Sequence, residues 1–133
     1  MTKIKVLIID DEPHAREGVR LLLAKDPDIE IAAEAGNGSA AVTLIKEHRP
    51  DLVFLDIQMP GMDGFAVLDE LYPGEMPIVV FVTAYDQYAI KAFEANAIDY
   101  LLKPFDDDRF YATLEKAKKT YNLLRSTELN EKM

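Results

Sequence analysis

Residues 52–56 read Leu52-Val53-Phe54-Leu55-Asp56, an apolar run that ends on a single carboxylate. The run shows no polar alternation, so it lacks the pattern of a strand that keeps one face in water. Four further runs rich in Ile, Val and Leu lie at residues 4–9, 29–33, 78–82 and 98–102. Such runs are typical of strands that are buried on both faces, as in a parallel sheet.

The segments between these runs have apolar side chains at three- and four-residue spacing, which is typical of helices. Pro13 can occupy a first helical turn, and Asp26-Pro27 ends this helix. Asn37-Gly38-Ser39 offers capping residues to a second helix, which Pro50 closes. Three more helices are expected at residues 63–71, 86–94 and 106 to about 124. Because strand and helix alternate five times, the sequence predicts a parallel sheet with helices on both faces.

Length, composition and charge exclude several classes of protein. The 133 residues fit one domain, and the lack of cysteine excludes disulfides, thiolate metal sites and a cysteine nucleophile. The formal net charge of −9 opposes direct binding to nucleic acid. No apolar run approaches the length of a membrane span, and Asp10 and Asp11 end the first run too early for a signal peptide. We therefore expect a cytoplasmic protein that does not bind membranes.

Ligands of an open parallel sheet bind beyond the carboxyl ends of its strands, so the residues that end each run are candidates for function. Asp10 and Asp11 follow the first run, Asp56 ends the third, Thr83 follows the fourth and Lys103 follows the fifth. A cluster of carboxylates is tolerable when a cation offsets it. Oxygen ligands without imidazole or thiolate favour Mg²⁺. The sequence therefore predicts a magnesium site at this edge, beside a hydroxyl and an ammonium group.

This combination of groups suits phosphoryl transfer, in which positioning and charge neutralisation supply most of the catalysis. Lys103 can neutralise a phosphate oxygen, and Thr83 can donate a hydrogen bond to it. A carboxylate of the cluster could itself accept the phosphoryl group, since aspartyl phosphates are established covalent species.

From residue 3 to about residue 124, the chain resembles the receiver domain of a two-component response regulator. Four motifs in this order and spacing carry the resemblance: Ile8-Ile9-Asp10-Asp11-Glu12, Leu52-Val53-Phe54-Leu55-Asp56-Ile57-Gln58-Met59-Pro60-Gly61-Met62-Asp63-Gly64, Val82-Thr83-Ala84 and Tyr100-Leu101-Leu102-Lys103-Pro104-Phe105. Residues 83–105 are also similar to the LytTR subgroup, whose members join a receiver to a separate DNA-binding domain. The resemblance implies a flavodoxin-like, three-layer α/β/α fold with a five-stranded parallel sheet in the order 2-1-3-4-5.

The resemblance also implies a role for each candidate residue. Asp56 would accept a phosphoryl group from the phosphohistidine of a sensor histidine kinase, or from a small donor such as acetyl phosphate. Lys103, in a cis peptide with Pro104, would pair with a phosphoryl oxygen. Thr83 would move toward the phosphate and draw Tyr100 inward, which makes these two residues the switch. Mg²⁺ would be held by Asp10, Asp11, Asp56 and the backbone carbonyl of Gln58.

The implied protein is a self-phosphorylating and self-dephosphorylating switch rather than a turnover enzyme. Its output surface would be the fourth helix, fifth strand and fifth helix, residues 86–94 and 105–124, through which phosphorylated chains form a homodimer. Transcription would be regulated by a LytTR-type DNA-binding domain outside this chain. We expect residues 1–124 to form the receiver, and residues 125–133 to form a polar tail or the start of a linker to that output domain.

Each candidate residue also has a plain structural interpretation. Asp56 could cap a turn, Thr83 could cap a helix and Lys103 could be a solvated surface lysine. Their predicted convergence at one edge of the sheet favours the site. Tyr100 is interpreted as a core residue on sequence alone. For Glu12, an interaction with the dipole of the first helix is preferred.

The last predicted helix carries apolar residues four and three positions apart, at Phe110, Leu114, Ala117, Tyr121 and Leu124. This stripe could pack on the sheet as part of the core. Alternatively, it could extend past the domain as a coupling or dimerising helix. Packing on the sheet is the preferred interpretation.

Two rival functions are weighed against the switch. A magnesium-dependent phosphohydrolase with an aspartate nucleophile, similar to the haloacid-dehalogenase-like phosphatases, would need a second aspartate at position 58. This chain has Gln58 there, which disfavours the hydrolase. A degenerate receiver that only binds other proteins is disfavoured because every site residue is present.

Overall fold

The computed structural model describes the backbone of residues 3–132 and the side chains of residues 3–127. Five parallel strands form one sheet in the order β2-β1-β3-β4-β5, which confirms the predicted topology. The strands are β1 (Ile4–Ile9), β2 (Ile29–Ala35), β3 (Leu52–Asp56), β4 (Ile78–Thr83) and β5 (Asp99–Leu102). All five apolar runs of the sequence are therefore strands, and β3 lies at the centre of the sheet.

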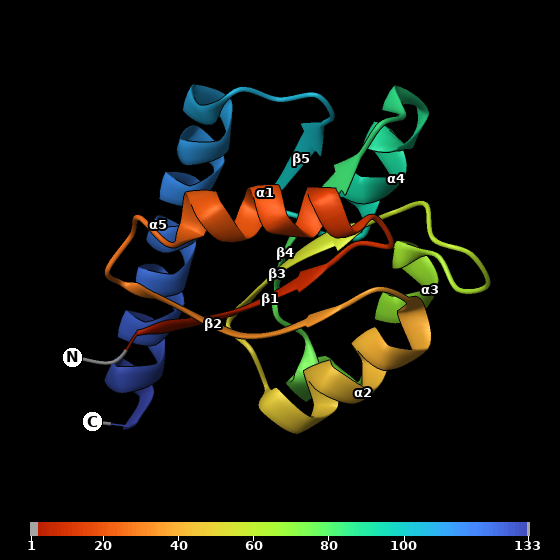
Figure 1. Ribbon diagram of the computed structural model, residues 1–133. Helices are drawn as coiled ribbons and strands as arrows, with labels where there is room; N and C mark the ends of the chain where they lie inside the picture. The colour runs from red at the N-terminus through yellow and green to blue at the C-terminus, as the bar shows by residue number, and fades with distance from the viewer. Residues whose placement is uncertain (1–2, 133) are drawn as a thin grey trace.

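Helices cover both faces of the sheet, so the molecule has three layers (Figure 1). Helices α1 and α5 lie on one face, and α2, α3 and α4 lie on the other. The helices are α1 (Pro13–Leu23), α2 (Gly38–His48), α3 (Gly64–Asp69), α4 (Ala89–Glu94) and α5 (Asp107–Lys132), with short 3-10 helices η1 (Pro73–Glu75) and η2 (Asp86–Tyr88). No helix in the described part of the chain is both long and apolar enough to cross a membrane.

The sheet separates two hydrophobic cores, because successive side chains of a strand point to opposite faces. Val53 and Leu55 of β3 face the core beneath α2, α3 and α4. Leu52 and Phe54 face the core beneath α1 and α5, where the Phe54 ring stacks on that of Phe110 at a centroid distance of 5.3 Å. Burial on both faces explains why the strands lack polar alternation.

The predicted capping residues fix the starts of α2 and α3. The side chain of Asn37 accepts a hydrogen bond from the backbone N–H of Ala40 at 2.8 Å. Asp63 is the cap of α3 rather than its first residue, and its carboxylate accepts from Ala66 N–H at 2.8 Å. Helix α3 is also shorter than predicted, because its last turn tightens to hydrogen bonds between residues three apart, such as that from Leu71 N–H to the Leu68 carbonyl.

Two further predicted boundaries differ from the structure. The fourth helix does not run unbroken over residues 86–94: it is the 3-10 turn η2 followed by α4, because Ala89 N–H bonds the Asp86 carbonyl three residues back. Strand β2 continues past residue 33 to Ala35, which pairs with Ile9. The polar Glu34 concealed this extension in the sequence, since it lies in the strand and pairs with Arg20 at 2.7 Å.

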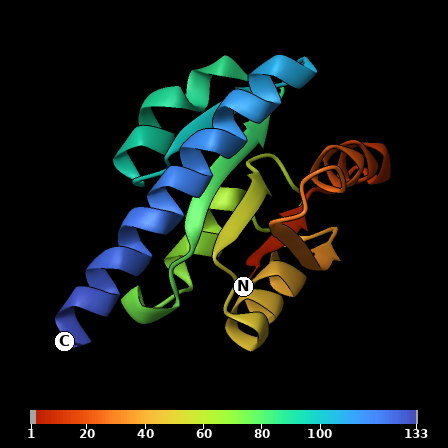
Figure 2. The ribbon, with the colours of Figure 1, turned by 90° about the vertical axis from the view of Figure 1, so that its left-hand side faces the viewer.

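Helix α5 does not end near Leu124 as predicted but continues to Lys132. Residues 107–132 contain neither Gly nor Pro, so no strong helix breaker follows the apolar stripe. Figure 2 shows the helix running along one side of the sheet, with its C-terminal end at the edge of the molecule. Its buried stripe ends early: Phe110 is fully buried, whereas Leu124 is 58% exposed. Met133, the last residue of the predicted polar tail, lies outside the described residues.

Candidate functional site

Three carboxylates meet at the carboxyl edge of the sheet. Asp10 and Asp11 follow β1, and Asp56 is the last residue of the neighbouring strand β3. One oxygen from each of the three side chains lies within 4.8 Å of the others. Asp10 and Asp56 are both buried, with only 4% of each residue exposed. The parallel order of β1 and β3 therefore creates the predicted acidic cluster.

The ammonium group of Lys103 lies against this cluster. Its Nζ is 2.8 Å from Asp10 Oδ2 and 3.9 Å from Asp56 Oδ2. Lys103 follows β5, and its backbone N–H donates to the carbonyl of Thr83 on β4 at 2.7 Å. The bond between Lys103 and Pro104 is cis, as the resemblance implied.

Backbone hydrogen bonds orient the two buried carboxylates. Asp10 Oδ1 accepts from the N–H of Glu12 at 2.9 Å, and Asp56 Oδ1 accepts from the N–H of Gln58 at 3.1 Å. Each aspartate thus closes a turn of the type expected of an Asp at a strand end. The second oxygen of each, Oδ2, is the one that faces Lys103.

The loop after β3 approaches its strand so closely that Gly64 is required there. A Cβ atom added to Gly64 would lie 2.6 Å from the carbonyl oxygen of Asp56, which is closer than van der Waals contact allows. The N–H of Gly64 also bonds the Ile57 carbonyl at 2.9 Å. This contact fixes the backbone on either side of the Asp56 carboxylate.

The three carboxylates of the cluster outnumber the one ammonium group, Lys103, that contacts them. Burial and the neighbouring Asp10 carboxylate raise the pKa of Asp56 to about 8, although Lys103 acts in the opposite direction. Burial alone would lower the pKa of Lys103, but its contacts with Asp10 and Asp56 outweigh burial and raise it. Three carboxylates beside one ammonium group, with oxygen atoms alone as donors, suit a hard divalent cation.

An open cleft of about 410 Å³ leads to these groups from solvent. Its lining includes Asp11, Asp56, Gln58, Tyr85 and Lys103. A group of the size of a phosphoryl moiety therefore has room beside the carboxylate of Asp56.

Thr83 and Tyr100 both contact the loop after β4, but neither is among the residues that line the cleft. Thr83 is fully buried, and its hydroxyl oxygen accepts a hydrogen bond from the N–H of Tyr85 at 3.2 Å. This bond closes a local turn rather than capping a helix, because the cap residue of η2 is Tyr85, so the plain interpretation of Thr83 as a helix cap is wrong. Tyr100 packs partly against the core, and its hydroxyl donates to the carbonyl of Tyr85. Both residues thus contact the same loop after β4.

Comparison with known protein families identifies the family of the chain. Residues 6–115 match the family described as the response regulator receiver domain. The chain belongs to this family. The receiver match includes all four strand-end positions that carry the acidic cluster, the hydroxyl and the ammonium group.

Individual relatives agree with this assignment. The receiver is 49% identical over 126 residues to the transcriptional regulatory protein BtsR of Salmonella typhi, a match that covers 91% of this chain and 53% of that protein. The chain thus spans about half the length of the curated relatives it matches.

Solved receiver structures have the same fold. The receiver domain of AraT from Geobacillus stearothermophilus superposes with a TM-score of 0.83 at 35% identity, covering 91% of this chain and 97% of that one. The response regulatory domain of mrkE from Klebsiella pneumoniae gives a TM-score of 0.81 at 30% identity, covering 90% and 98%.

The structure adds contacts to this receiver site that the sequence did not point to. Arg16 of α1 donates to the backbone carbonyl of Asp10 at 2.6 Å, and Glu12 lies 3.4 Å from Lys103 Nζ. Glu12 stands at the cap position of α1 but makes no side-chain capping bond, so the lysine contact adds to the preferred dipole interpretation. Tyr88 of η2 accepts a hydrogen bond from the side chain of Gln58. No sequence spacing indicates this contact, because it joins residues that lie 30 positions apart.

Proposed function

We propose that this receiver domain is a phosphorylation-dependent switch in which Asp56 accepts a phosphoryl group from the phosphohistidine of a sensor histidine kinase. The observation that carries the proposal is the placement of the buried Asp56 carboxylate at the floor of an open cleft, 3.9 Å from Lys103 Nζ and beside Asp10 and Asp11. The BtsR relatives are named transcriptional regulatory proteins, which supports a role in signal transduction.

Mg²⁺ fits the donor set of this cluster. The ligands would be oxygen atoms of Asp10, Asp11 and Asp56 and the backbone carbonyl of Gln58. When bound, the ion supplies positive charge that favours the ionised form of Asp56 and offsets the charge of a phosphoryl group. Such positive charge would assist the reaction, because the pKa of Asp56 is raised and only the ionised carboxylate is a good nucleophile.

Asp56, Lys103 and Thr83 each have a part in the phosphoryl transfer. A carboxylate oxygen of Asp56 attacks phosphorus, the bond from phosphorus to the histidine nitrogen of the donor breaks, and that nitrogen takes a proton from solvent. Lys103 pairs with a phosphoryl oxygen and offsets its negative charge. The hydroxyl of Thr83 exchanges its bond to Tyr85 N–H for a bond to the phosphate. Hydrolysis by water later restores Asp56, so the domain switches state rather than turning over a substrate.

Movement of Thr83 would change the surface formed by α4, β5 and α5. Thr83 and Tyr100 both contact the Tyr85 segment, so a shift at Thr83 reaches Tyr100 and the start of α4. This surface exposes large apolar side chains, with Ile90 77% and Phe93 84% exposed. We infer that phosphorylated chains form a homodimer there.

The output of the switch lies outside this receiver. We infer that a LytTR-type DNA-binding domain follows it in the whole protein and regulates transcription, and that the protein acts in the cytoplasm, where genes are read. The net charge of −9 supports a receiver that does not itself bind nucleic acid. Residues 1–124 would form the receiver, and residues 125–133, helical to Lys132, would lead from it.

Phosphorylation by acetyl phosphate tests this proposal against its two rivals. The chain is incubated with acetyl phosphate and Mg²⁺, and its intact mass is measured. A gain of one phosphoryl group that needs Mg²⁺ and is lost in Asp56→Asn supports the switch. Asp63→Asn is the matched control, because asparagine still caps α3. Release of phosphate over many turnovers without a mass gain would indicate a phosphohydrolase, and no reaction would indicate a degenerate receiver.

A further inference from the structure

The backbone and the side chain of Gln58 bond two different parts of the molecule. Its backbone N–H donates to Asp56 Oδ1, but its carboxamide Nε2 donates to the hydroxyl of Tyr88 on η2. Gln58 lines the same cleft as Asp56 and Lys103. A residue that lines the cleft is therefore bonded through its carboxamide to the segment that leads into α4.

Tyr88 is well placed to hold this carboxamide. Its ring packs against the core beneath α3, at a centroid distance of 6.3 Å from Phe65. The ring also meets that of Tyr85 edge-on at 6.5 Å. With its ring fixed by these neighbours, Tyr88 presents its hydroxyl to Gln58 from a supported position.

We propose that Tyr88 is a positioning residue whose bond to the Gln58 carboxamide prolongs the phosphorylated state. The inference rests on the proposed function. In hydrolysis, a water oxygen attacks phosphorus, the bond from phosphorus to the Asp56 oxygen breaks, the carboxylate leaves, and a proton of the water passes to solvent. A carboxamide both donates and accepts hydrogen bonds, so a free Gln58 at the cleft can orient this water. Tyr88 withholds the carboxamide from that role.

The loss of one hydroxyl tests the proposal. In Tyr88→Phe the ring packing is kept and the carboxamide is released. We expect the phosphorylated protein, freed of acetyl phosphate and followed by intact mass, to decay about two- to tenfold faster, the range that one hydrogen bond is worth. Tyr72→Phe is the matched control and should decay at the wild-type rate, because Tyr72 is 71% exposed on the segment before η1.

A double variant shows whether Tyr88 acts through Gln58. Methionine has nearly the volume of glutamine but cannot orient water, so Gln58→Met should remove the effect of Tyr88→Phe. The double variant is expected to decay at the rate of Gln58→Met alone. The proposal is overturned if Tyr88→Phe decays at the wild-type rate, or if its acceleration persists in the double variant.

A second readout does not depend on phosphorylation. The chain has two glutamines, Gln58 and Gln87, so the side-chain amide NMR signals of Gln58 can be assigned by their loss in Gln58→Met. Those signals should move in Tyr88→Phe and stay in place in Tyr72→Phe; signals that do not move in Tyr88→Phe overturn the proposal. Failure of the wild-type chain to gain a phosphoryl group would overturn the proposed function instead, and the inferred effect on hydrolysis with it.

Discussion

The carboxylate of Asp56 lies in an unfavourable environment for an ionised group. It is buried, it stands beside Asp10, and Lys103 is closer to Asp10 than to Asp56. These conditions raise its pKa to about 8, so ionisation of Asp56 at neutral pH opposes folding when no cation is bound. The unfavourable electrostatic environment of Asp56 would be relieved by a bound cation, which is why we expect the cation to bind beside this carboxylate.

Neutralising Asp56 should therefore stabilise the metal-free domain. A raised carboxyl pKa gives stability that is full below the unfolded pKa, near 4, and falls as pH rises toward 8. At pH 8 in the presence of a chelator, we expect Asp56→Asn to unfold at a higher temperature than wild type, by about 1–3 kcal/mol in unfolding free energy. Thermal denaturation measures the effect. An Asp56→Asn variant less stable than wild type under these conditions would contradict this view of the site.

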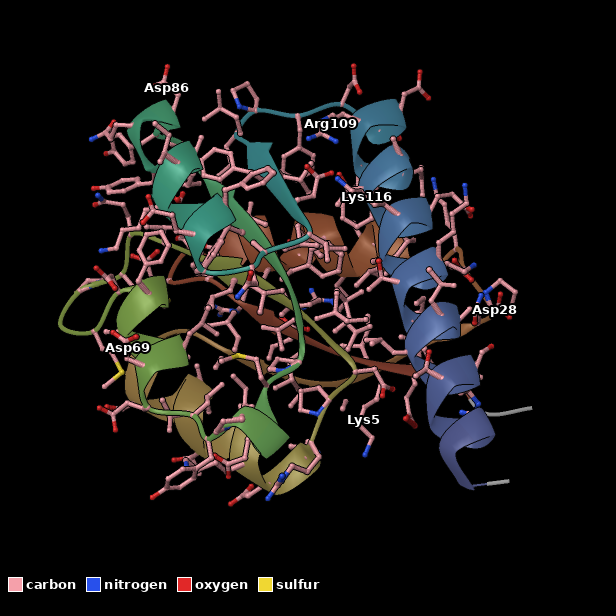
Figure 3. The ribbon with its side chains drawn as sticks, turned by 180° about the vertical axis from the view of Figure 1, so that it is seen from behind. Lys5, Asp28, Asp69, Asp86, Arg109 and Lys116 are labelled. Atoms are coloured by element: carbon pink, nitrogen blue, oxygen red, sulfur yellow. The ribbon has the colours of Figure 1, made fainter. Side chains whose placement is uncertain are left out.

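The pKa of Asp99, at the start of β5, is shifted in the opposite direction to that of Asp56. Burial would raise the pKa of Asp99, but hydrogen bonds from Arg109 and Thr113 outweigh burial and lower it to about 2. Arg109, labelled in Figure 3, reaches Asp99 from α5 at 2.9 Å. The group contributes stability that is present above its unfolded pKa, near 4, and lost as pH falls through about 2.

Acid denaturation of an asparagine variant tests this ion pair. Above pH 4, we expect Asp99→Asn to be less stable than wild type by about 1 kcal/mol, a value reduced by solvent around the pair. The difference should shrink between pH 4 and pH 2, because Asp99 of the unfolded wild-type chain takes up a proton in this range while Asp99 of the folded chain, with its pKa of about 2, does so only at the lower end. A difference that stays constant over this range would show that the carboxylate charge contributes nothing.

Single residues of the site could be predicted from the sequence wherever a strand end determined their position. Asp10, Asp56 and Lys103 each follow a buried run, and parallel strands bring such residues to one edge. The contact between Gln58 and Tyr88 could not be predicted, because it depends on how two loops fold over that edge. The turn bond of Thr83 to Tyr85 is equally a property of loop geometry rather than of spacing.

At the scale of elements, the junction of β3 with α3 depends on close backbone approach. Gly64→Ala would place a methyl group 2.6 Å from the Asp56 carbonyl, so the loop must shift. We expect a loss of about 1–3 kcal/mol in unfolding free energy and slower phosphorylation of Asp56. Chemical denaturation and intact mass measure the two effects. Gly74→Ala is the control and should change neither, since no atom lies within 4 Å of its added Cβ; equal effects would refute the role of Gly64.

Element boundaries were less predictable than the elements themselves. Strands and helices follow from apolar periodicity, which the core enforces. Helix ends depend on local hydrogen bonds instead: η2 forms because Ala89 N–H bonds the residue three back, and α5 continues past Leu124 because no breaker follows. The apolar stripe of α5 correctly indicated its buried face at Phe110 but not the length of the helix.

At the scale of the whole molecule, the site and the inferred output surface meet at β5 and at the loop after β4, which Thr83 and Tyr100 both contact. Sheet order was predictable because the receiver resemblance and the βα alternation agree. The inferred dimer does not follow from the fold of a single chain, because its exposed apolar residues do not by themselves identify the partner that contacts them. Its test therefore requires an assembly measurement.

Sedimentation of the phosphorylated chain tests the inferred dimer. With acetyl phosphate and Mg²⁺, we expect the wild-type chain to shift from monomer toward dimer. Phe93→Glu should stay monomeric while gaining its phosphoryl group, because it places a charge on the 84% exposed apolar site of α4. Leu21→Glu, a 59% exposed position on α1 and outside this surface, is the control. Dimerisation that Leu21→Glu abolishes and Phe93→Glu does not would move the interface to α1.

Locating the phosphoryl group on the chain tests whether Asp56 is the residue that accepts it. Borohydride reduction converts an aspartyl phosphate to homoserine while leaving free carboxylates intact, and peptide mass spectrometry then identifies the modified residue. After reaction with acetyl phosphate and Mg²⁺, we expect homoserine at position 56, with Asp10 and Asp11 unchanged. Modification of Asp10 or Asp11 in place of Asp56, or no homoserine in a chain that has gained a phosphoryl group, would contradict this expectation.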